Sequence, residues 1–73
     1  MKQFFVKYCI GNALVQFSTV MDIIPGKSAS ETYSVILRKI KDDHNKCVKD
    51  EIKGYFTYIT TEDIIILVLT QLN

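Results

Sequence analysis

The first part of the chain alternates in a pattern typical of two β-strands joined by a tight turn. Residues 3–10 (QFFVKYCI) and 13–23 (ALVQFSTVMDI) are rich in the aromatic and β-branched side chains that strands favour. Between them lies Gly11-Asn12, a pair suited to a two-residue hairpin turn because both residues tolerate positive φ. The sequence therefore predicts an antiparallel hairpin.

A two-residue turn also fixes which residues of the hairpin lie opposite each other. One face would be almost entirely apolar, whereas the other would mix Phe5, Lys7 and Cys9 with Leu14 and polar residues. Because a shift of one residue would bury Lys7, we expect the pairing that keeps it on the mixed face. On the apolar face this pairing is Ile10–Ala13, Tyr8–Val15, Val6–Phe17 and Phe4–Thr19.

A helical pattern follows Pro25-Gly26. Residues 28–31 (SASE) have the form of a capping box, in which Ser28 and Glu31 satisfy each other's backbone N–H groups. Residues 42–45 (DDHN) are poor helix formers, which leaves two interpretations: one helix to about Lys53, with Gly54 after it, or a break near His44. The predicted buried stripe is Ala29, Tyr33, Ile36, Leu37, Ile40, His44 and Cys47, and Asn45 falls on the polar side.

The last segment contains an uninterrupted apolar run, residues 64–69 (IIILVL). Because β-branched side chains crowd a helix, we favour a strand over about residues 63–72. The alternative is a helix that begins at Thr61. Residues 55–59 (YFTYI) are candidates for one further strand, joined to the last one by a turn at residues 60–63 (TTED).

Together these elements predict a single α+β domain over residues 1–73, in the order β-β-α-β. A right-handed crossover would place the final strand beside the first and antiparallel to it, with the helix packed on one face of the sheet. Simple alternation puts Ile65, Leu67 and Leu69 on one face and Ile64, Ile66 and Val68 on the other. One row must lie on the face without the helix, beside Phe5 and Leu14.

An apolar surface of that size needs a cover. Three covers are consistent with the sequence: a second copy of the chain, a partner protein, or residues 48–59 of the chain itself. Burial of four such side chains would contribute about 6–12 kcal/mol. The surface is therefore the main clue to function that the hydrophobic pattern provides.

Composition and charge exclude several classes of protein. The chain has 73 residues, 48% of them hydrophobic and 23% charged, as expected for one globular domain. A net charge of +1 argues against a strongly basic nucleic-acid binder. The longest apolar run is far shorter than the roughly 20 residues of a membrane-spanning helix. Two cysteines and no secretory signal lead us to expect a cytoplasmic protein of a bacterial host cell, with free thiols.

The sequence offers little for catalysis or metal binding. His44 and Cys47 form an H-x-x-C pair on one helix face, but a closed zinc site needs four ligands and Cys9 is the only other cysteine. Adjacent carboxylates such as Asp42 and Asp43 diverge around a helix and do not form an acid/base pair. The three glycines are isolated, so no phosphate-binding loop is predicted. We expect no enzyme activity, no cofactor and no metal.

Basic and aromatic side chains gather in residues 38–58, which provides a nucleic-acid-binding alternative. The basic residues are Arg38, Lys39, Lys41, Lys46, Lys49 and Lys53, and Tyr55, Phe56 and Tyr58 follow. The same stretch contains four acidic residues, and mixed charges along a helix are typical of a solvated surface. This alternative therefore ranks below protein binding.

Four features together resemble very small phage and prophage accessory proteins: the FxVxYxI start, the Gly-Asn pair, the Ser-x-Ser-Glu helix entry and the DIIILVLTQL ending. Some proteins of that kind, anti-CRISPR proteins among them, inhibit host defence complexes by occupying a surface. The resemblance implies an inhibitor that docks on a larger complex without catalysis. It transfers no site residues to this chain.

We therefore expect a non-enzymatic protein-binding module, with no membrane partner. One candidate contact is apolar and the other is the charged side of the helix. The alternatives are the nucleic-acid-binding module and a structural homodimer in which the terminal strand adds to a neighbour's sheet edge. The apolar candidates are Phe5, Leu14, Ile65, Leu67 and Leu69, and the charged ones are Arg38, Lys41 and Lys49.

Overall fold

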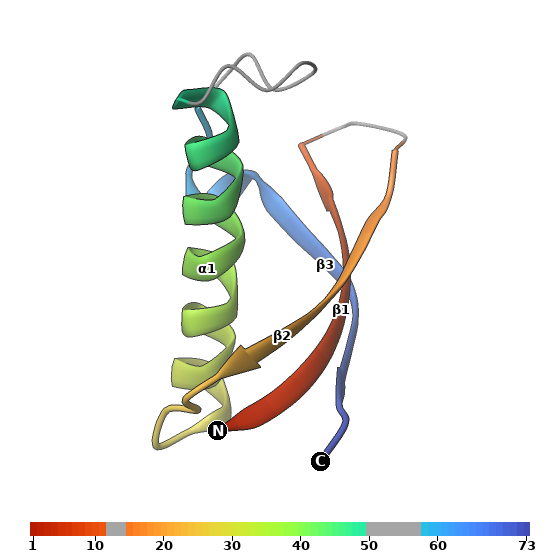
Figure 1. Ribbon diagram of the computed structural model, residues 1–73, viewed down its shortest axis with the longest axis vertical. Coiled ribbons are helices and arrows are strands. Elements are labelled where there is room, and N and C mark those ends of the chain that lie inside the picture. Colours follow the sequence, from red (N-terminus) through yellow and green to blue (C-terminus); the bar gives the residue numbers. More distant parts are fainter. Residues whose placement is uncertain (12–14, 50–57) are drawn as a thin grey trace.

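The computed structural model describes residues 1–11, 15–49 and 58–73. These residues form three strands, one long helix and a short 3-10 turn (Figure 1). The sheet order is β2-β1-β3, and both outer strands run antiparallel to β1. The α+β fold and its strand-strand-helix-strand order, predicted from the sequence, are therefore confirmed. The elements are β1 Lys2–Ile10, β2 Phe17–Ile23, α1 Ala29–Lys49, η1 Thr61–Asp63 and β3 Ile64–Gln71.

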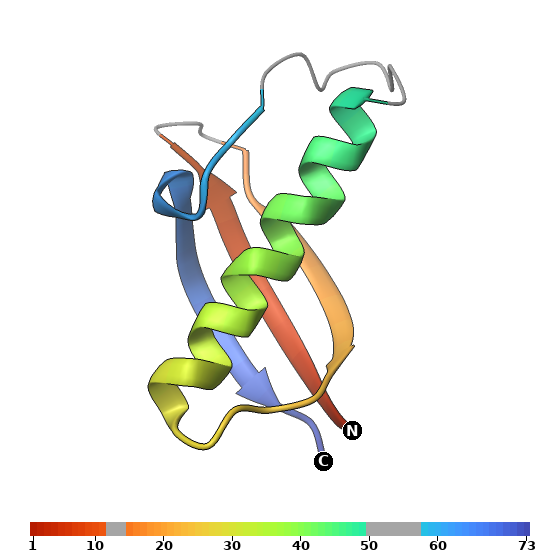
Figure 2. The same cartoon turned by 90° about the vertical axis from the view of Figure 1, so that its left-hand side faces the viewer.

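The helix α1 crosses one face of the sheet diagonally, and no other helix among the described residues lies on the opposite face (Figures 1 and 2). Alternate residues of β1 and β2 point toward α1, because side chains alternate along a strand. The apolar stripe of α1 meets them, so the core is a single layer between helix and sheet. Its buried members are Phe4, Val6, Met21, Ile23, Ile36, Ile40 and Ile64.

The register of the hairpin differs from the predicted one by two residues. Tyr8 lies opposite Phe17 and Val6 opposite Thr19, so the turn is longer than two residues, and residues 12–14 lie outside the described part. An even shift leaves every side chain on its predicted face, which explains why the apolar pattern could not detect it. The observed pairing stacks the rings of Tyr8 and Phe17, with centroids 5.5 Å apart, and such aromatic pairs stabilise a sheet.

Gly11 takes part in a contact that a two-residue turn would not provide. Its φ is 59°, a value that glycine adopts without strain. In this conformation its N–H donates to the carbonyl oxygen of Asp63 at 2.6 Å. Gly11 therefore ties the end of β1 to the residue that precedes β3.

The N-terminus of α1 is capped by a network that only partly matches the predicted capping box. The Glu31 N–H donates to Ser28 Oγ at 3.2 Å, as expected, but the Glu31 carboxylate accepts the N–H of Lys27 at 2.7 Å. Thr32 adds a second link, since its hydroxyl accepts the Gly26 N–H at 3.0 Å and donates to the Ser28 carbonyl. The loop and the first helical turn are thereby fixed to each other.

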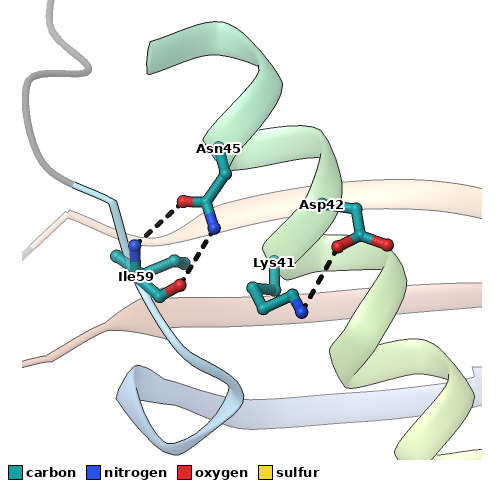
Figure 3. Close-up of polar contacts among 4 residues, drawn as sticks. All are labelled: Lys41, Asp42, Asn45 and Ile59. Carbon is teal, nitrogen blue, oxygen red and sulfur yellow. Dashed lines mark hydrogen bonds and ion pairs between the residues drawn. The ribbon is translucent and has the colours of Figure 1, made fainter. Parts of the chain in front are cut away.

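The helix continues without a break through residues 42–45 to Lys49, so the predicted alternative of a break near His44 is wrong. Its course beyond Lys49, including Gly54, lies outside the described residues. Asn45, predicted to lie on the polar side of the helix, bonds a segment that is distant in the sequence. Asn45 Oδ1 accepts the Ile59 N–H at 2.9 Å and its Nδ2 donates to the Ile59 carbonyl at 3.0 Å (Figure 3).

This pair of hydrogen bonds clamps residues 58–60 to the helix. Ile59 in turn packs against the buried core, and η1 and β3 follow directly in the chain. Asn45 therefore positions the segment that leads into the last strand. A residue that breaks helices by bonding to backbone groups here bonds the backbone of a distant segment.

We expect Asn45→Ala to lower the free energy of unfolding by about 1–3 kcal/mol, because both backbone groups of part-buried Ile59 lose their partner. Chemical denaturation followed by circular dichroism measures this loss. Asn45→Asp keeps the acceptor but sets a carboxylate oxygen against the Ile59 carbonyl oxygen, so it should not recover the stability that Asn45→Ala loses. The exposed neighbour Lys46 provides the control, and Lys46→Ala should change stability by no more than about 0.5 kcal/mol. Equal stability of Asn45→Ala and Lys46→Ala would contradict the clamp.

The C-terminal segment forms a strand, β3, within the predicted range. The alternative helix from Thr61 is limited to the single turn η1, in which Thr60 N–H donates to Asp63 Oδ2 at 2.8 Å. The further strand predicted at residues 55–59 is wrong for Tyr58 and Ile59, which are not in a strand. Residues 55–57 lie outside the described range.

Candidate functional site

The candidate site is the sheet face that α1 does not cover, which we call the open face. It is formed by the side chains that alternate with the core residues along the three strands. Several of them are apolar and exposed: Val20 is 54% exposed, Ile65 47% and Val68 42%. A solvent-facing sheet surface normally carries polar residues, so this composition calls for a cover. The open face consists of Gln3, Phe5, Lys7, Cys9, Ser18, Val20, Asp22, Ile65, Val68 and Thr70.

An irregularity in β3 changes which of its residues belong to the open face. Lys7 lies opposite Val68 while Tyr8 lies opposite Ile66, so Leu67 is an additional residue that forms a β-bulge. A bulge shifts the phase of alternation along its strand. Beyond it, Val68 and Thr70 share the face of Ile65, whereas Leu69 and Gln71 pair with Val6 and Phe4 on the helix side.

The predicted placement of the apolar candidates on one face is therefore confirmed only in part, and their contact with a partner stays a prediction. Phe5 and Ile65 lie on the open face, as expected, and Leu67 is exposed at the bulge. The expectation for Leu69 is wrong, because the bulge turns it toward the helix side, and Val68 takes its place. Leu14 lies outside the described residues. The sequence signal that could have revealed Val68 is weak, since uniform aliphatic residues on both sides of Leu67 conceal a change of phase.

Lys7 is the charged group in the middle of the open face. It lies on the central strand between Ser18 and Val68, and it is half-buried. The stem of a lysine packs along apolar neighbours while the ammonium group stays in water. Among the described residues of the open face, Asp22 is the only acidic one. It lies opposite Gln3, which is four residues from Lys7 along β1. Any molecule that covers the centre must therefore accommodate a positive charge.

The charged candidates of the helix form a separate surface. Arg38, Lys41 and Lys49 lie on α1, on the other side of the sheet from the open face (Figure 1). Arg38 and Lys49 are exposed, whereas Lys41 is half-buried and its Nζ lies 3.4 Å from Asp42 Oδ1 (Figure 3). The structure therefore does not bring the two candidate contacts together.

In the described part of the basic stretch (residues 38–58), acidic and basic side chains lie together near the end of α1. A shallow pocket there is lined by Asp42, Asn45, Lys46, Lys49 and Tyr58. Tyr58 is exposed, as a base-stacking residue would need to be, but the carboxylate of Asp42 shares the pocket. Tyr55 and Phe56, the other aromatic candidates, lie outside the described residues.

The candidate metal ligands are not brought together among the described residues. No group of three or more His, Cys, Asp or Glu side chains among them could hold a metal ion. His44 and Cys47 line a small cavity of about 100 Å³ together with Tyr8, Ile10, Phe17 and Asp43. Cys9, the third candidate ligand, lies on the open face, so the sheet separates it from the other two. Both cysteines are free thiols.

The described helix α1 is not long and apolar enough to cross a membrane. Comparison with known proteins gives no match to a family model, to a curated protein or to a solved structure.

Proposed function

We propose that the protein is a non-catalytic module that binds a protein partner through the open face of its sheet. We further propose that it inhibits a larger complex by covering part of that complex, as the resemblance to small phage accessory proteins implies. The observation that carries the proposal is the exposure of Val20, Ile65 and Val68 on a face without a helix. Apolar patches of this kind mark interaction surfaces.

Lys7 defines the chemistry of the partner. Removing an ammonium group from water without a counter-charge costs several kcal/mol, so the surface that covers Lys7 must offer a carboxylate. Around this carboxylate the partner must be apolar. Val68 lies opposite Lys7 on β3, Phe5 is the next open-face residue of β1, and Val20 lies opposite Phe5 on β2. The expected partner surface is thus apolar with an acidic group near its centre, and association should weaken with salt.

The test compares charge reversals on the two candidate surfaces. Tagged protein is used to capture partners from a lysate of the native host at low salt, and captured proteins are quantified by mass spectrometry. We expect Lys7→Glu to reduce recovery of the wild-type partner at least tenfold, because the reversed charge repels the partner's carboxylate. The matched control is Arg38→Glu/Lys49→Glu, which changes exposed residues of α1 and should leave recovery unchanged.

Two results would overturn the proposal. Loss of the partner with the helix variant but not with Lys7→Glu would assign binding to the charged side of α1. A wild-type chain that recovers no protein above the background of an untagged control would remove protein binding as the function. Both variants are checked by circular dichroism, so that unfolding is not mistaken for lost binding.

A further inference from the structure

The outer edge of β3 offers a second interaction surface, distinct from the open face. Among the described strands β3 pairs only with β1, so its other edge has no strand partner there. From Ile64 to Gln71 it contains no charged residue and no proline. The opposite edge strand, β2, carries Asp22. Proteins usually protect edge strands with charges or proline, and the edge of β3 lacks both.

Backbone hydrogen bonds show which groups of β3 point outward. The Leu72 N–H donates to the Gln3 carbonyl at 2.8 Å, so Leu72 faces β1. Residues of an antiparallel strand alternate between bonding one neighbour and the other. Thr70 therefore also bonds β1, and Leu69 and Gln71 direct their N–H and C=O groups to the outer edge. These two residues offer two donors and two acceptors after the bulge.

An uncharged groove of about 330 Å³ lies beside this part of β3, on the helix side. Leu69, Gln71 and Phe4 line it from the sheet, and Ala29, Thr32 and Tyr33 line it from the first turns of α1. Figure 2 shows these turns of α1 beside the end of β3. Leu69 and Tyr33 are both partly exposed there. A strand added to the edge would place every second side chain next to this groove.

We propose that this edge pairs with β3 of a second copy of the chain, antiparallel and about a two-fold axis at Thr70. The occupant must be an extended, uncharged and apolar strand, and β3 itself has these properties. In a two-fold interface each surface meets its own copy, so the outward groups of Leu69 and Gln71 in one protomer meet those of Gln71 and Leu69 in its partner. The two donors and two acceptors of each protomer then pair with those of its partner in four hydrogen bonds, without reaching the bulge at Leu67.

This register has two structural consequences. On the helix side, Leu69 of one protomer lies beside Gln71 of its partner, at the groove. On the other side, the two Thr70 side chains face each other directly, a favourable cross-strand pair. The sheets of the two protomers become continuous, so their open faces lie side by side. The pairing uses the edge and does not depend on the proposed function of the open face.

A disulfide cross-link tests the register. Thr70→Cys is made in a Cys9→Ser/Cys47→Ser background and incubated with oxidised glutathione. The two Thr70 residues form a non-hydrogen-bonded pair with Cα atoms about 4.5 Å apart, within the range of a disulfide. We expect a covalent dimer on a non-reducing gel. Val68→Cys is the matched control, because its two copies would be displaced by four residues, about 13 Å along the strands.

Cross-linking of Val68→Cys as readily as Thr70→Cys would overturn the register. A strictly monomeric wild-type chain in light scattering at the same concentration would overturn the dimer. Gln71→Pro removes one outward N–H and no hydrogen bond to β1, so it should weaken the dimer at least tenfold while the circular dichroism spectrum is unchanged. Lys7→Glu should leave the dimer intact, which separates this proposal from the proposed function.

Discussion

Replacing Ile36 by alanine is expected to lower the free energy of unfolding by about 2–5 kcal/mol. Ile36 is 0% exposed and lies in the middle of α1, within the core that joins the helix to the sheet. A single core in a chain of this size rarely supplies more than about 3–5 kcal/mol in total. The variant should therefore be largely unfolded at 37 °C. Urea titration followed by circular dichroism at the helical signal measures the change.

The control for Ile36→Ala is an alanine substitution on the exposed side of the same helix. Lys39 is exposed, so Lys39→Ala should change the free energy of unfolding by no more than about 0.5 kcal/mol. Similar, small effects of both substitutions would show that α1 does not pack on the sheet through Ile36. A large effect of Lys39→Ala alone would reverse the assignment of the buried and exposed sides.

The middle of the helix stripe and the faces of β1 and β2 could be predicted because burial imposes a period that the sequence records. Ala29 and Tyr33, predicted at the start of the buried stripe, are exposed. Ile36 and Ile40 follow the helical period, and Phe4 and Val6 follow the strand period. The sequence could show neither that α1 continues through residues 42–45 nor that Asn45 meets the backbone of Ile59. A side chain that bonds a distant backbone group leaves no periodic signal, and intrinsic propensity argued for the opposite result.

The hairpin register shows a second limit of the hydrophobic pattern. Faces depend on odd or even spacing alone, so pairings that differ by two residues bury the same side chains. The observed pairing brings Tyr8 and Phe17 into a stacked contact across the hairpin. Such a specific contact between two side chains of the same face leaves no mark in the alternation of apolar and polar residues.

The bulge at Leu67 accounts for the main difference between the predicted and the observed composition of the open face. Six consecutive aliphatic residues, 64–69, satisfy either phase of alternation equally well. The phase is set instead by the ends of the strand, because Ile64 and Gln71 are both held on the helix side by pairing with Ile10 and Phe4. Seven positions separate those two residues, an odd number, so one extra residue must be accommodated between them. The open face therefore contains Val68 in place of Leu69.

Aspartate substitutions at Val68 and Leu69 test this assignment and the proposed function together. Val68→Asp should weaken binding of the captured partner at least a hundredfold, which corresponds to about 2.7 kcal/mol, because the new carboxylate lies opposite Lys7, neutralises its charge and repels the partner's carboxylate. Its free energy of unfolding should fall by no more than about 1 kcal/mol, since a carboxylate on the open face stays in water and lies opposite Lys7.

Leu69→Asp should show the opposite behaviour, because Leu69 lies on the helix side between Val6 and the groove. We expect it to lower the free energy of unfolding by about 1–3 kcal/mol, while the open face of the remaining folded protein still recovers the partner. Affinity is measured by titrating the purified partner, and stability by urea denaturation of the same samples. If Leu69→Asp abolished binding while Val68→Asp had no effect, the side chains of β3 would alternate without a bulge. Leu69, and not Val68, would then lie on the binding surface. The comparison uses neighbouring residues of similar size and exposure, so the position on the sheet is the main difference between them.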